Sequence, residues 1–161
     1  MTESQQTDLV DPFGRRVEYL RLSVTDRCDL RCHYCIPKGF KDFEEPPNWL
    51  RFDEIERLVS VMADMGLRKL RITGGEPLVR KDLPSLVSRL KAVSGIQDLS
   101  LSTNATRLAH HAEALRAAGV DRLNISLDTL DRERFAAITG RDCLPQVLEG
   151  LELARSLGFA P

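Results

Sequence analysis

Residues 19–35 read YLRLSVTDRCDLRCHYC and set a pattern that the rest of the chain repeats. Apolar and polar side chains alternate over Tyr19–Thr25, so a β-strand here has one apolar face and one polar face. Three cysteines with C-x3-C-x2-C spacing follow at once, in the loop behind the strand. Parallel α/β folds place their functional sites in such loops. The stretch therefore predicts a first strand that presents a cysteine-bearing loop at its carboxyl end.

Short alternating runs and longer runs with helical spacing take turns along the remaining chain. The alternating runs predict further strands over residues 69–73, 98–103 and 122–127. The helical spacings predict helices over residues 52–66, 83–93, 109–118, 132–138 and 145–157. Strands that alternate with helices form βα units with a parallel sheet and right-handed crossovers. The expected fold class is α/β: an incomplete (βα) barrel with about four βα units of a parallel sheet.

The polar strand faces are unusual for a parallel sheet, whose strands are normally covered on both sides and apolar throughout. The predicted helices carry apolar stripes that must pack on the apolar face, so the polar face points away from them. In a closing barrel that polar face lines the lumen, which suits a polar ligand. The alternative is a sheet with one solvated face. The pattern favours the polar lumen.

Composition excludes several classes of protein. The 161 residues carry a formal net charge of −1, so no large cationic field attracts nucleic acid or anionic lipid. No run of about 18 apolar residues occurs, and the first residues lack the apolar core of a signal peptide. We therefore expect a cytoplasmic protein, in which four cysteines indicate metal binding or free thiols before disulfides. Residues 1–12 are expected to form a flexible tail, and residues 13–161 one domain.

Cys28, Cys32 and Cys35 are spaced to hold three corners of a [4Fe–4S] cluster, whose usual ligand is cysteine thiolate. The fourth iron then lacks a protein ligand, and an open metal position is a site for reaction. The alternative is a structural zinc site completed by His33 or Cys143. Such sites usually combine two separated pairs of ligands, and this sequence has no second pair. A disulfide would leave one cysteine over. Together with the motifs that follow, the triad favours the cluster.

Gly74-Gly75-Glu76-Pro77 stands at the end of the second predicted strand. Two glycines allow the backbone to approach a ligand closely, and their carbonyls can accept hydrogen bonds from an ammonium group. Taken alone, the motif is typical of a turn from strand to loop. Together with a cysteine loop on the first strand, it indicates a ligand contact.

These motifs together resemble the radical S-adenosylmethionine (SAM) superfamily: three cysteines with Tyr34 before the last of them, and Gly74-Gly75-Glu76-Pro77 one strand later. The resemblance runs from about Phe13 to the end of the chain. It implies a barrel of the radical SAM type, a [4Fe–4S] cluster and SAM bound at the open iron. It also implies reductive cleavage of SAM to a 5′-deoxyadenosyl radical.

Four longer strings resemble one branch of this superfamily, the GTP 3′,8-cyclases of molybdenum cofactor biosynthesis. They are LRLSVTDRC (20–28), RITGGEPL (71–78), STN (102–104) and LNISLD (123–128). The resemblance implies a lyase that converts GTP to (8S)-3′,8-cyclo-7,8-dihydroguanosine 5′-triphosphate, a precursor of molybdopterin. By position, it assigns SAM contacts to Tyr34, Gly75 and Ser126, and GTP contacts to Arg21, Arg71 and Ser102. It assigns no catalytic residue beyond the cluster.

The same resemblance sets expectations for partners and extent. Members of this branch continue beyond the equivalent of residue 161 and bind a second [4Fe–4S] cluster there. We therefore expect residues 13–161 to be the N-terminal part of a radical SAM core domain, inactive without its C-terminal part. The expected partners are GTP and a reductant protein, with no nucleic acid and no membrane, and the complete protein is compatible with a homodimer.

Two positions depart from the pattern of this branch: Ser102 stands where threonine is usual, and Ala105 where glycine is usual. Two alternative functions remain open. One is a radical SAM enzyme with a different substrate, and the other is an inactive fragment that binds only a cluster or SAM. The two arginines of the polar face, Arg21 and Arg71, favour an anionic substrate.

Overall fold

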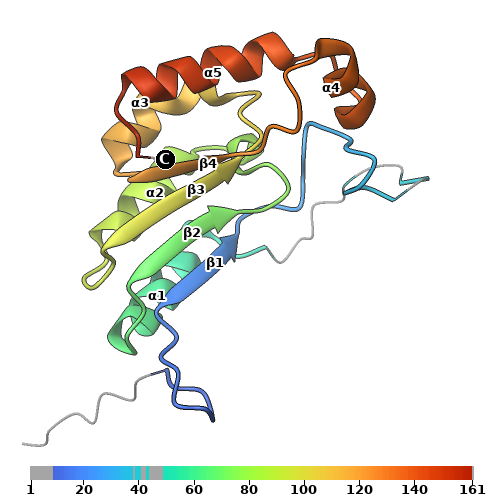
Figure 1. The fold of residues 1–161 in the computed structure, drawn as a ribbon. Coiled ribbons are helices and arrows are strands. Elements are labelled where there is room, and N and C mark those ends of the chain that lie inside the picture. The colour runs from blue at the N-terminus through green and yellow to red at the C-terminus, as the bar shows by residue number, and fades with distance from the viewer. Residues whose placement is uncertain (1–8, 38, 41–42, 44–48, 161) are drawn as a thin grey trace, which may run out of the picture.

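The computed structural model describes residues 9–37, 39–40, 43 and 49–160. Its strands form one 4-stranded parallel sheet in the order β1-β2-β3-β4 (Figure 1). The strands are β1 (Tyr19–Ser23), β2 (Lys69–Thr73), β3 (Asp98–Thr103) and β4 (Arg122–Ile125). The helices are α1 (Phe52–Asp64), the 3-10 helix η1 (Pro77–Val79), α2 (Leu83–Ala92), α3 (Leu108–Ala118), α4 (Arg132–Thr139) and α5 (Leu144–Ser156). The predicted α/β fold of parallel βα units is confirmed.

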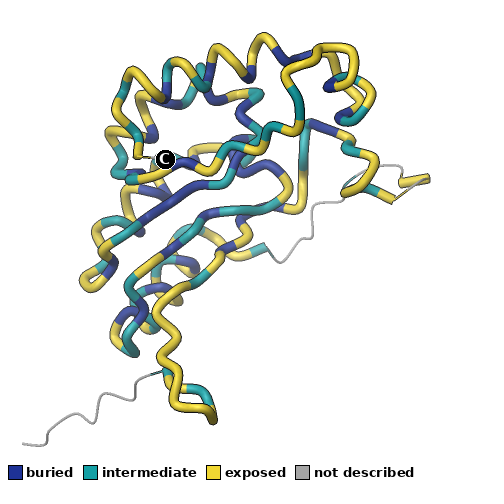
Figure 2. The backbone as a smooth tube through the Cα atoms, in the orientation of Figure 1, coloured by how far each residue is buried: buried dark blue, intermediate teal, exposed yellow. Residues whose placement is uncertain are grey.

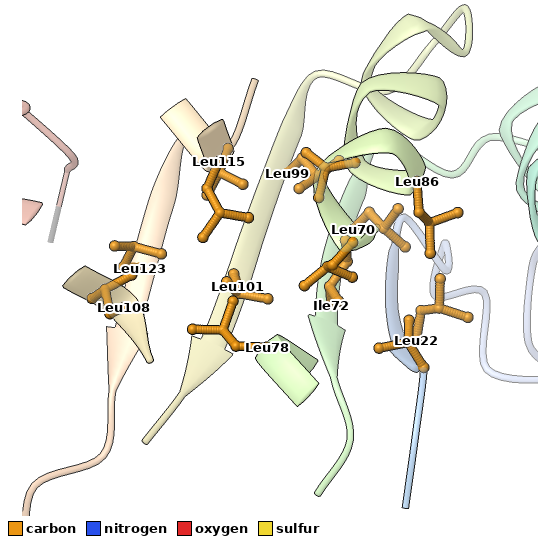
Figure 3. Close-up of a cluster of buried hydrophobic side chains, with 14 of the residues drawn as sticks. Leu22, Leu70, Ile72, Leu78, Leu86, Leu99, Leu101, Leu108, Leu115 and Leu123 are labelled. Atoms are coloured by element: carbon orange, nitrogen blue, oxygen red, sulfur yellow. The ribbon is translucent and has the colours of Figure 1, made fainter. Parts of the chain in front are cut away.

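The apolar faces of the strands meet the apolar stripes of the helices and form the core. Leucines and one isoleucine from all four strands point toward Leu86 of α2 and toward Leu108 and Leu115 of α3 (Figure 3). Fully burying each such side chain contributes roughly 1.5–3 kcal/mol. In Figure 2 the dark blue segments follow this interface, whereas the outer faces of the helices are yellow.

The opposite face of the sheet is polar, as the alternation predicts, and its side chains are aligned by the register. Arg21 pairs with Arg71, and Arg71 pairs with Ser100. Two residues beyond Ser100, closer to the carboxyl edge of the sheet, Ser102 pairs with Asn124. Side chains at paired positions share a face, so the two arginines stand side by side on adjacent strands. The four strands form an open sheet and not a closed barrel.

The last described residues lie along the outer edge of β4. Ala160 forms a parallel bridge with Arg122, and the Leu123 N–H donates to the Ala160 carbonyl at 3.4 Å. After helix α5 the chain therefore returns to the sheet and runs parallel to β4, as a fifth parallel strand would. This return follows the right-handed βα pattern of the preceding units.

The predicted tail over residues 1–12 lies outside the described residues for its first eight positions. From Leu9 onward the backbone is hydrogen-bonded: the Leu9 N–H donates to the Met65 carbonyl at 2.9 Å, and Val10 bridges Arg16 in antiparallel fashion. In the part of the chain that the structure describes, no helix has the length and apolar character needed to cross a membrane.

Candidate functional site

The three cysteines of the predicted triad line one cavity of about 390 Å³. The cavity lies where β1 and β2 end, since Ser23 and Thr25 form one wall and Gly74 and Gly75 another. Carboxyl ends of parallel strands are where α/β folds gather their sites. The structure therefore joins the two motifs that the sequence places one strand apart.

The cysteine loop is fixed by backbone hydrogen bonds on both sides of Cys32. The N–H groups of Cys35 and Ile36 donate to the Cys32 carbonyl at 2.9 and 3.0 Å, so Cys32 and Cys35 bracket one tight turn. The Arg31 N–H donates to the Thr139 carbonyl at 2.8 Å, which ties the loop to the end of α4. The loop thus lines the cavity with its three cysteines and is attached to the end of α4 through the Arg31 backbone.

The environment of the thiols fits ligands of an iron–sulfur cluster. Burial raises the pKa of Cys28 and of Cys32, and a bound cation would counteract this effect by stabilising the thiolates. The Leu30 N–H and the Asn104 amide donate to Cys28 Sγ at 3.4 and 3.8 Å. Hydrogen bonds of this kind accompany cluster cysteines and influence their reduction potential. The site thus offers three thiols, and one of them already accepts hydrogen bonds.

The residues of the alternative zinc site face elsewhere. His33 Nδ1 lies 3.3 Å from the Ile138 carbonyl, and Cys143 is buried in a separate cavity of about 270 Å³ with Asp29 and Arg141. Among the residues that the structure describes, no three His, Cys, Asp or Glu side chains converge on a single ion. A cubane distributes its cysteines over different irons and needs no such convergence.

Gly74 and Gly75 press directly against the start of the cysteine loop. The Gly75 N–H donates to the Thr25 carbonyl at 2.8 Å, and the Glu76 N–H donates to the Arg27 carbonyl at 2.7 Å. A Cβ atom on Gly75 would lie 2.4 Å from the carbonyl oxygens of Asp26 and Arg27. Only glycine allows this close approach of the two backbones. The conformation of the cysteine loop therefore requires glycine at position 75, whether or not a ligand is bound.

Glu76 is a carboxylate buried at the carboxyl ends of β2 and β3. Its Oε1 accepts from the Leu78 N–H at 3.0 Å and from the Thr103 hydroxyl at 2.8 Å. Its Oε2 accepts from the Asn104 N–H at 2.7 Å. Burial nevertheless dominates and raises the pKa of Glu76 to about 7. Glu76 thus ties the glycine motif to the end of the next strand.

This raised pKa predicts a pH-dependent stability. The folded state binds a proton at Glu76 more tightly than the unfolded state, whose pKa is about 4.5. The contribution is present below about pH 4.5 and is lost as the pH rises toward 7, by up to roughly 3 kcal/mol in the free energy of unfolding. Denaturant unfolding over this pH range should show the fall for the parent and not for Glu76→Gln. A constant difference between the two proteins would contradict the assignment.

Arg80 connects the two ends of the long segment that contains the cysteines. Its Nη1 donates to the Val24 carbonyl at 2.6 Å and its Nη2 to the Leu50 carbonyl at 2.8 Å. The guanidinium carbon also lies 4.9 Å from the centre of the Phe52 ring. The Arg80 side chain therefore links the start of this segment, just after β1, to its end, just before α1.

The predicted SAM contacts occupy two places. Gly75 lines the cavity of the three cysteines, whereas Tyr34 and Ser126 are not among the described residues that line it. The Tyr34 hydroxyl donates to Asp128 Oδ2 at 2.8 Å, and this hydrogen bond raises the pKa of the phenol. Since Asp128 follows β4 two residues after Ser126, this bond brings the cysteine loop to the segment that carries the third predicted contact.

The predicted GTP contacts all lie on the polar sheet face. Arg21 is exposed and Arg71 half-buried, and Ser102 stands on the neighbouring strand β3. Arg71 Nε donates to Ser100 Oγ at 3.4 Å, and its guanidinium lies 5.7 Å from the centre of the Tyr19 ring. Ser23, which lines the cysteine cavity, is two residues beyond Arg21 on the same face, about 7 Å along the strand. Arg21 and its paired residue Arg71 therefore lie on the sheet face that leads to the cavity.

Sequence reasoning missed a polar cluster beside Cys28, which consists of Asp29, Asn104 and Thr106. The Asn104 amide donates to Asp29 Oδ1 at 2.9 Å, and the Thr106 hydroxyl donates to Asp29 Oδ2 at 2.6 Å. Asp, Asn and Thr are ordinary turn residues, so nothing in their type distinguishes them. The position of Asn104 directly after the predicted strand 98–103, where parallel α/β folds gather their sites, is the signal that could have found them.

The chain belongs to the radical SAM superfamily, whose family model matches residues 22–161. Membership implies a [4Fe–4S] cluster and SAM as cofactors. Among curated proteins, the chain is 55% identical over 151 residues to the GTP 3′,8-cyclase of Ectopseudomonas mendocina, covering 94% of this chain and 45% of that protein. It is 51% identical over 151 residues to GTP 3′,8-cyclase 2 of Pseudomonas aeruginosa, with the same coverage of 94% and 45%. The chain therefore spans a little under half the length of these curated relatives.

Solved structures show the same fold at low sequence identity. Streptococcus suis SuiB bound to S-adenosylmethionine superposes with a TM-score of 0.67 and is 20% identical, covering 88% of this chain and 30% of that one. SuiB bound to its precursor peptide SuiA gives a TM-score of 0.70 at 22% identity, covering 88% and 31%. These likenesses confirm the fold of the incomplete barrel, and the family model gives its radical SAM type.

Proposed function

We propose that Cys28, Cys32 and Cys35 hold the [4Fe–4S] cluster and leave one iron open for SAM. The shared cavity of about 390 Å³ and the hydrogen bonds to Cys28 Sγ support these ligands. Gly75, Tyr34 and Ser126 would contact SAM. When bound, the cluster and SAM supply a 5′-deoxyadenosyl radical.

The substrate that fits best is GTP, and the product is then (8S)-3′,8-cyclo-7,8-dihydroguanosine 5′-triphosphate. The observation that carries this proposal is the identity of 55% with a GTP 3′,8-cyclase over nearly the whole chain. The paired arginines on the polar face support it independently, because a guanidinium can donate two charge-assisted hydrogen bonds to a phosphate.

In this proposal the chain's own residues bind and orient the substrate. Arg21 on β1 and Arg71 on β2 would bind the triphosphate. The Ser102 hydroxyl on β3 would contact the nucleotide closer to the carboxyl edge of the sheet. Holding the sugar within reach of the radical converts an encounter into an intramolecular step. The sheet face thus positions GTP, and the loops at its carboxyl edge position SAM.

Several features of the complete protein follow from the same proposal. Residues 13–161 form the N-terminal part of the core domain, and a second [4Fe–4S] cluster lies beyond residue 161. A reductant protein supplies electrons, and the complete protein is a lyase that functions in the cytoplasm, where the four described free cysteines are kept reduced. A homodimer is compatible with this assignment.

Separate titrations of SAM and GTP test the proposed function. The protein expressed from its complete reading frame, reconstituted without oxygen, should bind both ligands and form the cyclic nucleotide. Binding of SAM without GTP would indicate a radical SAM enzyme with another substrate. Binding of neither ligand would indicate an inactive cluster protein.

Arg71→Ala should weaken GTP binding far more than SAM binding. Loss of the charge-assisted hydrogen bonds to phosphate should cost about 1.5–3 kcal/mol, or roughly 10- to 150-fold in Kd. Isothermal titration of each ligand measures the effect. Arg57→Ala is the matched control, because Arg57 is exposed on α1, on the opposite side of the sheet. Equal losses for both ligands in Arg71→Ala would contradict a specific phosphate contact.

A further inference from the structure

The side chain of Asn104 uses its hydrogen-bonding groups in one defined orientation. Its Oδ1 accepts from the Thr106 N–H at 3.0 Å, and the Thr106 hydroxyl lies 2.8 Å from the same oxygen. Its Nδ2 donates to Asp29 Oδ1 at 2.9 Å and to Cys28 Sγ at 3.8 Å. A flipped amide would set its NH2 group against the Thr106 N–H and its oxygen against the Asp29 carboxylate. The network therefore directs the amide donors of Asn104 toward the cysteine loop.

Asn104 is itself held from the buried side of the site. Its backbone N–H donates to Glu76 Oε2, and the preceding residue, Thr103, donates its hydroxyl to Glu76 Oε1. Glu76 is 1% exposed, so this anchor lies within the packed region between β2 and β3. A fixed backbone and a determined amide orientation leave Asn104 little freedom beside Cys28.

The second partner of the Asn104 amide, Asp29, is held equally firmly. Its side chain is 11% exposed, and its Oδ2 accepts from the Thr106 hydroxyl at 2.6 Å. The guanidinium groups of Arg107 and Arg141 lie 3.7 and 3.5 Å from the same oxygen. The charge of Asp29 is therefore compensated locally, and its carboxylate fixes the turn that follows Cys28.

We propose that Asn104 is a positioning residue for the cluster, which orients Cys28 and raises the reduction potential through its N–H···S hydrogen bond. This inference rests on the proposed cluster ligands. A donor beside a thiolate sulfur stabilises the more negative, reduced cluster more than the oxidised one. Removal of the donor should therefore shift the potential to more negative values, while the Leu30 N–H continues to donate to Cys28.

The test compares Asn104→Ala with Thr106→Val in the reconstituted protein from the complete reading frame. Thr106→Val removes the hydroxyl that lies 2.6 Å from Asp29 Oδ2 and 2.8 Å from Asn104 Oδ1. It leaves in place the Thr106 N–H that orients the amide and both donors to Cys28. Iron content, circular dichroism and a redox titration followed by electron paramagnetic resonance are measured for each protein. We expect normal iron content, a more negative potential in Asn104→Ala and a parental potential in Thr106→Val.

Every other outcome also decides the question. Iron loss in folded Asn104→Ala alone would support the inference, since Cys28 then needs the amide to be oriented. An unchanged potential in Asn104→Ala, or equal changes in both variants, would overturn it. If Asn104→Ala does not fold, Asn104→Ser replaces it, because its hydroxyl can still accept from the Thr106 N–H. Absence of a four-iron cluster in the parent would refute the proposed function separately.

Discussion

Cys32→Ala is expected to abolish the cluster at the cysteine triad, with the loss of roughly four irons per chain after anaerobic reconstitution. Cys32 stands between the two other proposed ligands and shares one tight turn with Cys35, so its loss would leave two thiols, which hold a cubane poorly. Iron analysis and the brown absorbance of the protein measure the loss.

Cys143→Ser is the control for this experiment. Cys143 is buried in a separate cavity with Asp29 and Arg141, and its replacement should leave the iron content unchanged. Iron loss in Cys143→Ser would mean that the fourth cysteine is a ligand. A colourless parent protein with stoichiometric zinc would exclude the cluster altogether.

Gly75→Ala should disrupt the cysteine loop. The added Cβ would lie 2.4 Å from two backbone carbonyl oxygens, and backbone yields less readily than the end of a flexible side chain. We expect a loss of about 3 kcal/mol in the free energy of unfolding, together with reduced iron binding. Denaturant unfolding and iron analysis of the purified variant measure the two effects.

Gly14→Ala separates this clash from the general effect of replacing a glycine. A Cβ on Gly14 would meet nothing within 4 Å, and its φ of +78° alone should cost about 1 kcal/mol. If Gly75→Ala is no more destabilising than Gly14→Ala, the close approach of the two loops is not rigid.

The fold follows from the sequence because the strand signal is strong. Alternation over residues 69–73 and 98–103 predicts β2 and β3 with the bounds that the structure has. The fourth strand is shorter than predicted: β4 ends at Ile125 because its partner β3 ends at Thr103, the residue paired with Ile125. Periodicity reports which side chains share a face, but only the neighbouring strand determines where pairing stops.

The candidate site was predicted in part. The triad and the glycine motif are close in sequence to two adjacent strands, so their meeting in one cavity could be foreseen. The hydrogen bonds between Glu76, Asn104 and Asp29 could not, since they join segments far apart in the chain. Each of these residues is also common in turns or on surfaces, and only burial and geometry give it a role. The assigned SAM and GTP contacts stay predictions.

Arg80 has a consequence for the entropic cost of forming the site. By joining the Val24 and Leu50 carbonyls, its guanidinium closes the segment that carries the cysteines into a ring. The length-dependent entropy of closing such a ring is about 3 kcal/mol, and two charge-assisted hydrogen bonds offset about that amount. Arg80 thus joins the two ends of the segment without a cofactor. Cofactor binding therefore does not have to offset this part of the conformational entropy.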